Sequence, residues 1–259
     1  MYNLNINKKI KNNLDLIYKE NKRINSKNKS LKGCLDKDYI DKKKNFSSPP
    51  FQYFSINYFN FSEILNSKAK KKIQEEINFL LSLQNKDGSY DEWYKNERSF
   101  CTTSYSSFLI SNLLLENDKL DYDFKKKLTL SLEKSFNFLK NKFNKNILNQ
   151  NLAKLIFLIN FAKIDNNKNE IILSELSSHL NSVYDTVINS IEHEYKGIDL
   201  GYLTISLMLS AEILKKKNCK KTEKIFLRLL KLSKNLTLNF NYFPSDIFSR
   251  SSQSLLYFL

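Results

Sequence analysis

The chain is poor in the residues that make tight turns, because its 259 residues include only 4 Gly and 3 Pro. All-β sandwiches and barrels need many such turns between short strands, so they are excluded. Phosphate-binding folds built on glycine-rich loops are excluded for the same reason. Hydrophobic residues make up 41% of the chain, which is enough for a sizeable core and excludes a wholly disordered protein.

Cysteine and histidine are also scarce. The three cysteines, Cys34, Cys101 and Cys219, lie far apart and form no CxxC pair. Such an odd and small number of cysteines indicates a reducing compartment and argues against a framework of disulfide bonds. Only two histidines are present, and no His/Cys set has metal-ligand spacing, so we expect no metal and no cofactor. Residues 1–9 lack the apolar segment of a secretory signal, and we therefore expect a cytoplasmic protein.

Arginine is rare in a strongly basic chain, with four arginines beside 38 lysines and a formal net charge of +15. A protein selected to grip phosphates is expected to keep more arginine, because the guanidinium binds phosphate with two parallel hydrogen bonds. We therefore expect no nucleic-acid partner, and lysine runs such as Lys125–Lys127 and Lys215–Lys217 on solvated faces. The alternative is an anionic partner for these lysines.

Long hydrophobic runs are absent as well. The longest apolar stretch, residues 152–164, is 13 residues long and contains Lys154, Asn160 and Lys163. Such a segment is too short and too polar to span a bilayer, so we expect no transmembrane segment.

The chain does contain a regular helical pattern. Phe124, Leu128, Leu132 and Phe136 recur every four residues and form a single apolar stripe, which is typical of an amphipathic helix. The same one-sided pattern recurs over residues 6–17, 73–84, 172–187 and 226–236. Between these segments, residues 100–115, 152–164 and 200–214 are apolar on nearly all sides, which predicts buried helices.

One-sided outer helices and buried inner helices therefore alternate. The inner helices are expected to start near Phe51, Phe100, Asn151, Leu200 and Arg250, a period of about 50 residues that is typical of helical hairpin repeats. This pattern predicts an all-α fold over residues 51–259, either a closed α/α toroid or an incomplete arc of one, after a basic N-terminal arm (residues 1–50) with one amphipathic helix. A solenoid is the alternative.

The last expected inner helix ends on five apolar residues, Leu255–Leu259. Helix ends are normally polar, so we expect either that the domain is incomplete at its C-terminus or that a protein partner covers this helix.

One segment resembles a known repeat. Residues 79–90 end an apolar helix and continue as Gln84, two spacers, Asp87-Gly88-Ser89 and Tyr90. This order resembles the repeat of the squalene-cyclase and protein-prenyltransferase superfamily, and residues 99–105 and 197–202 resemble its inner-helix starts. Locally, Gly88 is free to take a positive φ in the turn, Gln84 can bond helix backbone, and Tyr90 is expected to pack back onto the inner layer.

The resemblance implies an α/α toroid, but the chemistry of the superfamily is not matched. Triterpene cyclases of this kind carry a D-x-D-D acid, whereas Asp121-Tyr122-Asp123 lacks the final aspartate. Protein prenyltransferases use an Asp, Cys and His zinc set, and no such set surrounds Cys101, which we interpret as a small buried hydrophobe.

In a toroid the loops that enter the inner helices share one rim. The loop of residues 87–99 holds the only tryptophan, and we expect it to bind ligand through five residues, with Glu97 as an acid/base candidate. These residues are Tyr90, Asp91, Trp93, Tyr94 and Arg98, and Tyr195 from a later loop is a sixth ligand-binding candidate. The alternative is a structured loop in which Arg98 pairs with a neighbouring carboxylate.

Two later loops supply the remaining candidates. In the loop of residues 191–199 and the helix that follows, His193, Asp199 and Tyr202 are acid/base candidates, although Asp199 alternatively only caps its helix. Near residues 241–250, Asp246 and Arg250 are candidate ligand-binding residues.

Three hypotheses on function follow. The first is an enzyme that acts at the rim on a small molecule, a glycan or a lipid-linked glycan. The second is an isoprenoid-binding or terpenoid-processing protein with an aromatic cavity. The third is a non-catalytic helical-repeat scaffold, because a fold of this kind does not determine an activity.

Overall fold

The structure is a computed structural model, and it describes seven stretches of the chain. These are residues 31–36, 39, 46–60, 67–118, 120–165, 169–189 and 198–236. The described residues are all-α: they form helices joined by turns, with a single isolated β-bridge between Tyr90 and Ser99. No described helix combines the length and apolarity needed to cross a bilayer. Most of the predicted N-terminal arm (residues 1–50) lies outside the described residues.

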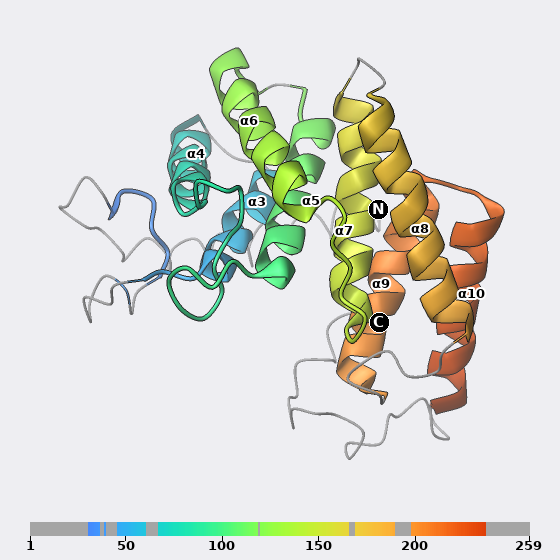
Figure 1. The fold of residues 1–259 in the computed structure, drawn as a ribbon. Helices are drawn as coiled ribbons and strands as arrows, with labels where there is room; N and C mark the ends of the chain where they lie inside the picture. Colours follow the sequence, from blue (N-terminus) through green and yellow to red (C-terminus); the bar gives the residue numbers. More distant parts are fainter. Residues whose placement is uncertain are drawn as a thin grey trace, which may run out of the picture. The chain divides into compact units, whose positions relative to one another are not determined.

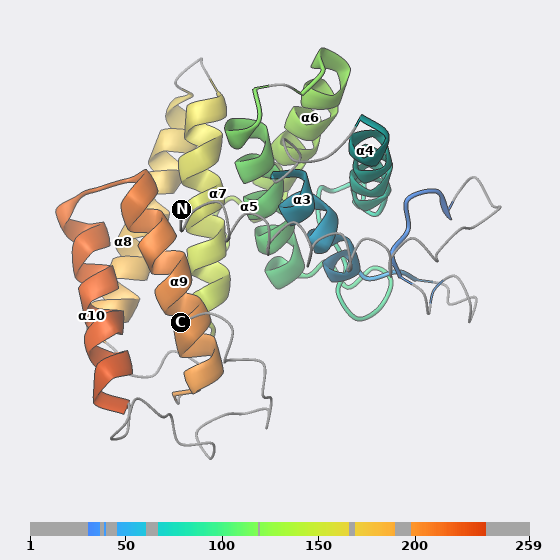
Figure 2. The same cartoon turned by 180° about the vertical axis from the view of Figure 1, so that it is seen from behind.

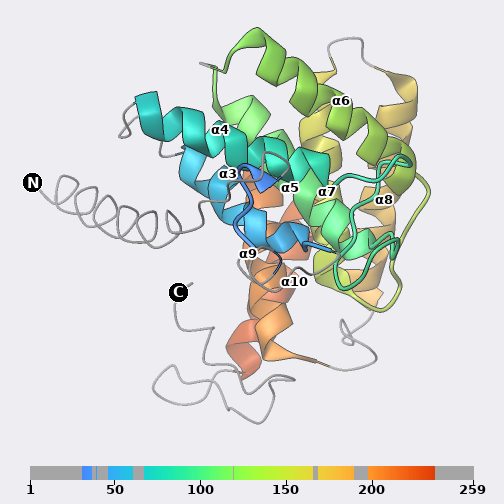
Figure 3. The same cartoon turned by 90° about the vertical axis from the view of Figure 1, so that its left-hand side faces the viewer.

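The chain divides into two compact units between Phe138 and Leu139. The described residues of the first unit form a short 3-10 helix and four α-helices (Figure 1). They are η2 (Pro49–Gln52), α3 (Tyr53–Asn60), α4 (Ser67–Ser82), α5 (Phe100–Glu116) and α6 (Tyr122–Leu139). Pro49 and Pro50 start η2, as expected of proline in a first helical turn, and α3 packs against both α4 and α5 (Figure 3).

In the part of the second unit that the structure describes, the chain forms four helices. They are α7 (Leu148–Ile164), α8 (Glu170–Asn189), α9 (Leu200–Lys216) and α10 (Lys220–Leu236). Each helix packs against two others: α7 contacts α8 and α9, and α10 contacts the same two (Figures 1 and 2). The core of this unit therefore lies between the two helical hairpins α7–α8 and α9–α10.

The predicted starts of the inner helices agree well with the structure. Phe100 and Leu200 are the first residues of α5 and α9, and Leu148 begins α7 three residues before the predicted Asn151. The expected start near Arg250 lies outside the described residues. The agreement follows from the alternation of one-sided and all-round apolar segments, which marks each helix boundary.

The expectation that all inner helices are buried on every side is right for α7 and wrong for α9. Helix α7 buries nearly every residue from Leu148 to Phe161. In α9 burial is confined to one face, and Ile205 and Met208 are 37% and 42% exposed. Apolar composition makes burial favourable, but it does not supply a neighbouring element for each face of the helix.

Helix α5 buries small hydroxyl side chains in preference to large apolar ones. Its buried residues are Thr102, Thr103, Ser104, Ser106, Ser107, Ile110, Ser111 and Leu113. Small side chains allow α3 to approach closely. The Tyr53 hydroxyl donates to the Thr102 carbonyl at 3.1 Å and lies 3.0 Å from Ser106 Oγ. The large side chains Tyr105 and Phe108 remain partly exposed.

Candidate functional site

The turn after α4 shows why the resembling segment contains its glutamine and glycine. Gly88 has a φ of 89°, as predicted. A Cβ atom at this position would lie 2.0 Å from the Lys134 carbonyl oxygen of α6, so no larger residue fits. The Gln84 side-chain amide lies 3.0 Å from each of three acceptors: the carbonyl oxygens of Gly88 and Ser131, and Ser135 Oγ. The turn is thereby held against α6.

Tyr90 follows this turn and is completely buried. Its backbone N–H donates to Thr103 Oγ1 of α5 at 2.8 Å, and its hydroxyl lies 3.2 Å from Ser131 Oγ of α6. Burial raises the pKa of the phenol above its usual range. Tyr90 is thus buried, but its hydroxyl contacts the outer helix α6, and only its backbone N–H contacts the inner helix α5. Its ring therefore supports the loop from below, with no surface for a ligand.

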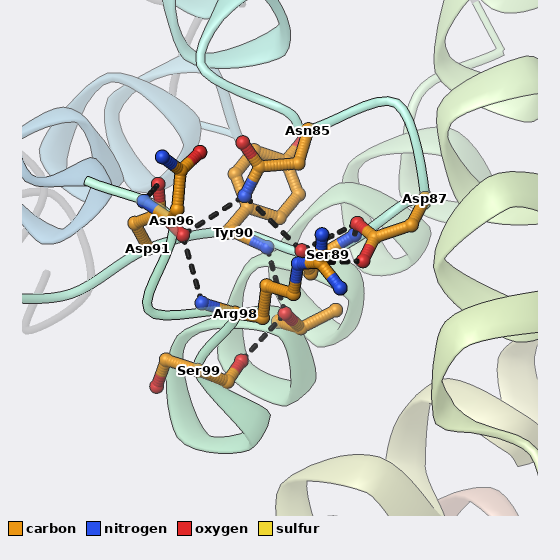
Figure 4. Close-up of polar contacts among 9 residues, drawn as sticks. Asn85, Asp87, Ser89, Tyr90, Asp91, Asn96, Arg98 and Ser99 are labelled. Atoms are coloured by element: carbon orange, nitrogen blue, oxygen red, sulfur yellow. Dashed lines mark hydrogen bonds and ion pairs between the residues drawn. The ribbon is translucent and has the colours of Figure 1, made fainter.

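Asp91 organises the loop that follows (Figure 4). Its side chain is 4% exposed and accepts three hydrogen bonds: from the backbone N–H groups of Asn96 and Arg98, both at 2.8 Å, and from Asn85 Nδ2 at 2.9 Å. Asn96 and Arg98 have φ values of 66° and 58°, a conformation that costs energy for residues with a Cβ. The Asp91 carboxylate compensates by satisfying their N–H groups.

The other carboxylates of the loop also hold its backbone. Glu97 Oε2 accepts from the N–H groups of Glu92 and Trp93, both at 2.7 Å. Ser99 Oγ donates to Glu92 at 3.0 Å and accepts from the Thr102 N–H at 3.1 Å, so it caps α5 at the same time.

Arg98 pairs with a carboxylate of the same loop, as the alternative interpretation expected. Its Nε lies 3.3 Å from Asp87 Oδ2, and both side chains are partly exposed. Asp87 also accepts from the N–H and the hydroxyl of Ser89, so it joins the glycine turn to the end of the loop (Figure 4).

Two aromatic side chains extend from this rigid loop. Trp93 is 68% exposed and Tyr94 is 64% exposed. The backbone that carries them is fixed from within by Asp91 and Glu97, which accept five hydrogen bonds between them. The backbone that carries the two rings is therefore preorganised, which saves ordering entropy on binding.

The positive-φ turn is repeated along the chain at intervals of about 50 residues. Gly33, with a φ of 88°, packs against α4, where a Cβ would lie 2.2 Å from the Glu75 carbonyl oxygen. Asn141, with a φ of 62°, donates its N–H to Glu175 Oε2 of α8 at 3.1 Å. In three successive hairpins, a residue in the left-handed region thus contacts the next outer helix.

A second position is repeated with it, four residues after the N-caps of η2, α5 and α7, although the equivalent position of α9 is the apolar Leu203. Thr103 accepts from Tyr90 as described. Asn151 accepts from the Asn144 N–H at 3.0 Å and donates to the Asn144 carbonyl at 2.6 Å. The Gln52 amide is oriented so that its nitrogen donates to the Gly33 carbonyl at 3.2 Å. Its oxygen accepts from the Leu35 N–H at 2.7 Å.

The second unit contains a buried cluster that does not include any predicted site residue. Lys154 of α7 is fully buried, and its Nζ donates to Glu175 Oε1 and to the Lys142 carbonyl, both at 2.7 Å. His179 of α8 lies 3.0 Å from the Asn151 carbonyl, with its ring edge-on to Phe143. Burial, reinforced by the Lys154 charge, lowers the pKa of His179 to about 3, so the ring is neutral and donates to that carbonyl.

The candidates from the later loops are only partly described. Asp199 is the N-cap of α9, where its Oδ1 accepts from the Tyr202 N–H at 2.9 Å. This is the capping role that the sequence offered as the alternative to acid/base catalysis. The Tyr202 side chain is partly exposed. His193, Tyr195, Asp246 and Arg250 lie outside the described residues, so the predicted convergence of the three loops stays a prediction.

Comparisons with known proteins do not assign a function to this chain. No family model, curated protein or solved structure matches the chain. Among the described residues, no group of three or more His, Cys, Asp or Glu side chains is placed to hold a metal ion. The site must therefore be interpreted from its own geometry.

Sequence reasoning missed the buried cluster and the repeated inner-helix position. The signal for the cluster was present, since Lys154 interrupts the most apolar segment of the chain and needs a buried carboxylate partner. The inner-helix position gave no such signal, because glutamine, threonine and asparagine perform the same task there.

Proposed function

We propose that the chain is a glycan-binding protein whose contact surface is the loop from Tyr90 to Ser99, with Trp93 and Tyr94 as the binding residues. The observation that carries this proposal is the exposure of both rings on a backbone that Asp91 and Glu97 hold in place. Rigid aromatic side chains supply large contact areas at low entropic cost, and they stack on the apolar face of a sugar ring.

Binding is favoured over catalysis by the state of the loop carboxylates. Asp91 is buried and accepts three hydrogen bonds from the loop. Glu97 accepts two backbone N–H groups through one oxygen. A general acid or base must reach the reacting group of the substrate, whereas these side chains reach the loop itself. Acid/base roles for Glu97, His193, Asp199 and Tyr202 stay predictions.

The fold that we propose for this protein is a divergent α/α toroid of the squalene-cyclase type. It is supported by the repeated positive-φ turns at Gly33, Gly88 and Asn141 and by the packing of Gln84 and Gly88 in the resembling segment.

A glycan is favoured over an isoprenoid because the exposed rings have the polar neighbours Lys95, Asn96 and Arg98 in sequence. An isoprenoid needs a dry apolar site.

Trp93 is the only tryptophan, so its fluorescence reports on the loop alone. Titration with cello-, chito- and malto-oligosaccharides is expected to blue-shift its emission and to protect it from acrylamide quenching. Tyr94→Ala is expected to weaken that response about tenfold, and Trp93→Ala to weaken binding by calorimetry about 30-fold. Tyr122→Ala is the matched control, since Tyr122 is 78% exposed on α6 and lies outside the loop.

The same titration separates the competing functions. A response to farnesol in place of oligosaccharides would support an isoprenoid-binding protein. No response to either class of ligand, in a chain that is folded by circular dichroism, would overturn the proposal and favour the scaffold.

A further inference from the structure

Helix α10 has the most one-sided charge of the described helices. It carries six basic residues, Lys220, Lys221, Lys224, Arg228, Lys231 and Lys234, and a single acidic residue, Glu223. Helix α8, which packs against it, carries three acidic residues and neither lysine nor arginine. Lysine is common throughout the chain, so the informative feature is this segregation and not the lysine content.

The lysines of α10 form a stripe on its exposed side. Lys220, Lys224, Leu227, Lys231 and Lys234 follow one another at intervals of four, three, four and three residues, so they lie on one face of the helix. All five are exposed, and Leu227 is 51% exposed. We call these five residues the α10 stripe. The opposite face, with Thr222, Ile225 and Leu229, is buried.

The four lysines of the α10 stripe are not neutralised within the described part of the chain. None of them has an ion-pair partner there, whereas the fully buried Lys154 of the same unit is paired with Glu175 at 2.7 Å. From Lys220 to Lys234 the stripe extends for about 21 Å along the helix axis. It is therefore a straight row of free ammonium groups with an apolar side chain at its centre.

We propose that the α10 stripe docks the protein on an anionic membrane surface. Lysine is a compact, strongly hydrated charge that suits a diffuse anionic surface, whereas specific phosphate recognition favours arginine. The one arginine of α10, Arg228, lies beside the stripe and is half-buried. Leu227 can enter the boundary between headgroups and acyl chains while the flanking lysines stay in the headgroup layer. A nucleic-acid backbone offers no comparable site for an exposed leucine.

The test uses the full chain and sedimentation with vesicles of phosphatidylcholine, with and without phosphatidylserine. We expect binding to the anionic vesicles only, and weaker binding as salt is added, because the Debye length is about 8 Å at physiological ionic strength. Each lysine near such a surface contributes a factor of about five to the partition coefficient. Replacement of the four stripe lysines by glutamine is therefore expected to reduce binding about 600-fold.

The matched control removes the same number of charges elsewhere. Lys126, Lys127, Lys134 and Lys140 are exposed in or next to α6, and their replacement by glutamine is expected to reduce binding less than threefold. Leu227→Asn is expected to reduce binding about fivefold without changing its salt dependence. Thermal melts of all three variants verify that each is folded.

Three outcomes would overturn the proposal. The first is an equal loss of binding in the α6 set, which would mean that net charge acts without a specific face. The second is equal binding to vesicles without phosphatidylserine. The third is binding of the stripe to single-stranded RNA but not to anionic vesicles. None of these outcomes bears on Trp93, so the two proposals fail independently.

Discussion

The Gly88 turn of the first unit and the Asn141 turn of the second unit both have a residue with positive φ, but they differ in their contacts. Gly88 lies against the Lys134 carbonyl, with no space for a Cβ. Asn141 has a side chain and donates its N–H to Glu175 at 3.1 Å. The loop after Gly88 is organised by the anionic Asp91, whereas the segment after Asn141 is organised by the cationic Lys154 and the neutral His179.

One part of the repeat is shared by the two turns and another part varies. Both turns have a residue with positive φ whose backbone contacts the next outer helix. The groups that satisfy the surrounding backbone differ in type and charge, because a buried N–H or carbonyl needs only a partner of suitable geometry. One difference has a structural consequence: an exposed aromatic pair follows the Gly88 turn, while a buried ion pair lies beside the Asn141 turn.

The largest expected effect concerns the Gly88 turn, where a backbone carbonyl leaves no space for a Cβ atom. Gly88→Ala places a Cβ 2.0 Å from a backbone oxygen that cannot move aside, and it adds the cost of a positive φ. We expect a loss of about 4 kcal/mol or more in the free energy of unfolding, measured by denaturant titration. Asn141→Gly is the matched variant and is expected to change stability by less than about 1 kcal/mol. A loss below about 1 kcal/mol in Gly88→Ala would contradict the packing described here.

The next effect concerns the buried ion pair. Lys154→Met leaves Glu175 and the Lys142 carbonyl without their shared donor, and a broken buried pair costs about 3–5 kcal/mol. We expect a lower denaturation midpoint by circular dichroism. Lys163→Met, at an exposed position of the same helix, is expected to change stability by less than about 0.5 kcal/mol. Equal effects of the two variants would mean that Lys154 is not buried in a pair.

A moderate effect is expected at the carboxylate that organises the aromatic loop. Asp91→Asn replaces one accepting oxygen by an N–H₂ group that faces other donors, with an expected cost of about 2 kcal/mol. Limited proteolysis is expected to cut the variant within residues 91–98. Asp123 is exposed on α6, and Asp123→Asn serves as the control. It is expected to lower the free energy of unfolding by less than about 0.5 kcal/mol. An intact loop in Asp91→Asn would show that the backbone keeps its shape without this carboxylate.

The smallest effect is a dependence of stability on pH. The pKa of His179 is about 3 in the folded chain and about 6.5 when unfolded, so only the unfolded state gains this proton as pH falls through that window. The stabilisation is complete above pH 6.5 and declines below it, by about 1.4 kcal/mol between pH 7.5 and 5.5. His179→Gln keeps a donor for the Asn151 carbonyl and is expected to flatten this slope in denaturant titrations. An unchanged slope would mean that the imidazole is protonated in the folded state.

Local features were predictable because they depend on residues that are close in sequence. The positive φ of Gly88 follows from its place in an Asp-Gly turn, and the capping role of Asp199 from its place before an apolar helix. The start of α5 at Phe100 follows from the change in hydrophobic period. The candidate loop was found because rare residue types gather in it.

The roles within that loop were not predictable from composition. Asp91 and Glu97 are chemically suited to acid/base work, and only their contacts show that they bind N–H groups of their own loop. Tyr90 and Tyr94 are the same residue type four positions apart, yet the first is completely buried and the second is 64% exposed. Sequence spacing did not distinguish them, because neighbouring elements cover one and not the other.

The helical class, the repeat of about 50 residues and the left-handed turn at Gly88 all follow from local propensity and from the period at which apolar side chains recur. Three further features depend on packing between distant segments: Lys134 excludes a side chain at Gly88, Lys154 pairs with Glu175, and one face of α9 stays exposed. Those outcomes depend on which distant segments meet, and the cost of an unpaired charge or an overlapping atom is set by those contacts.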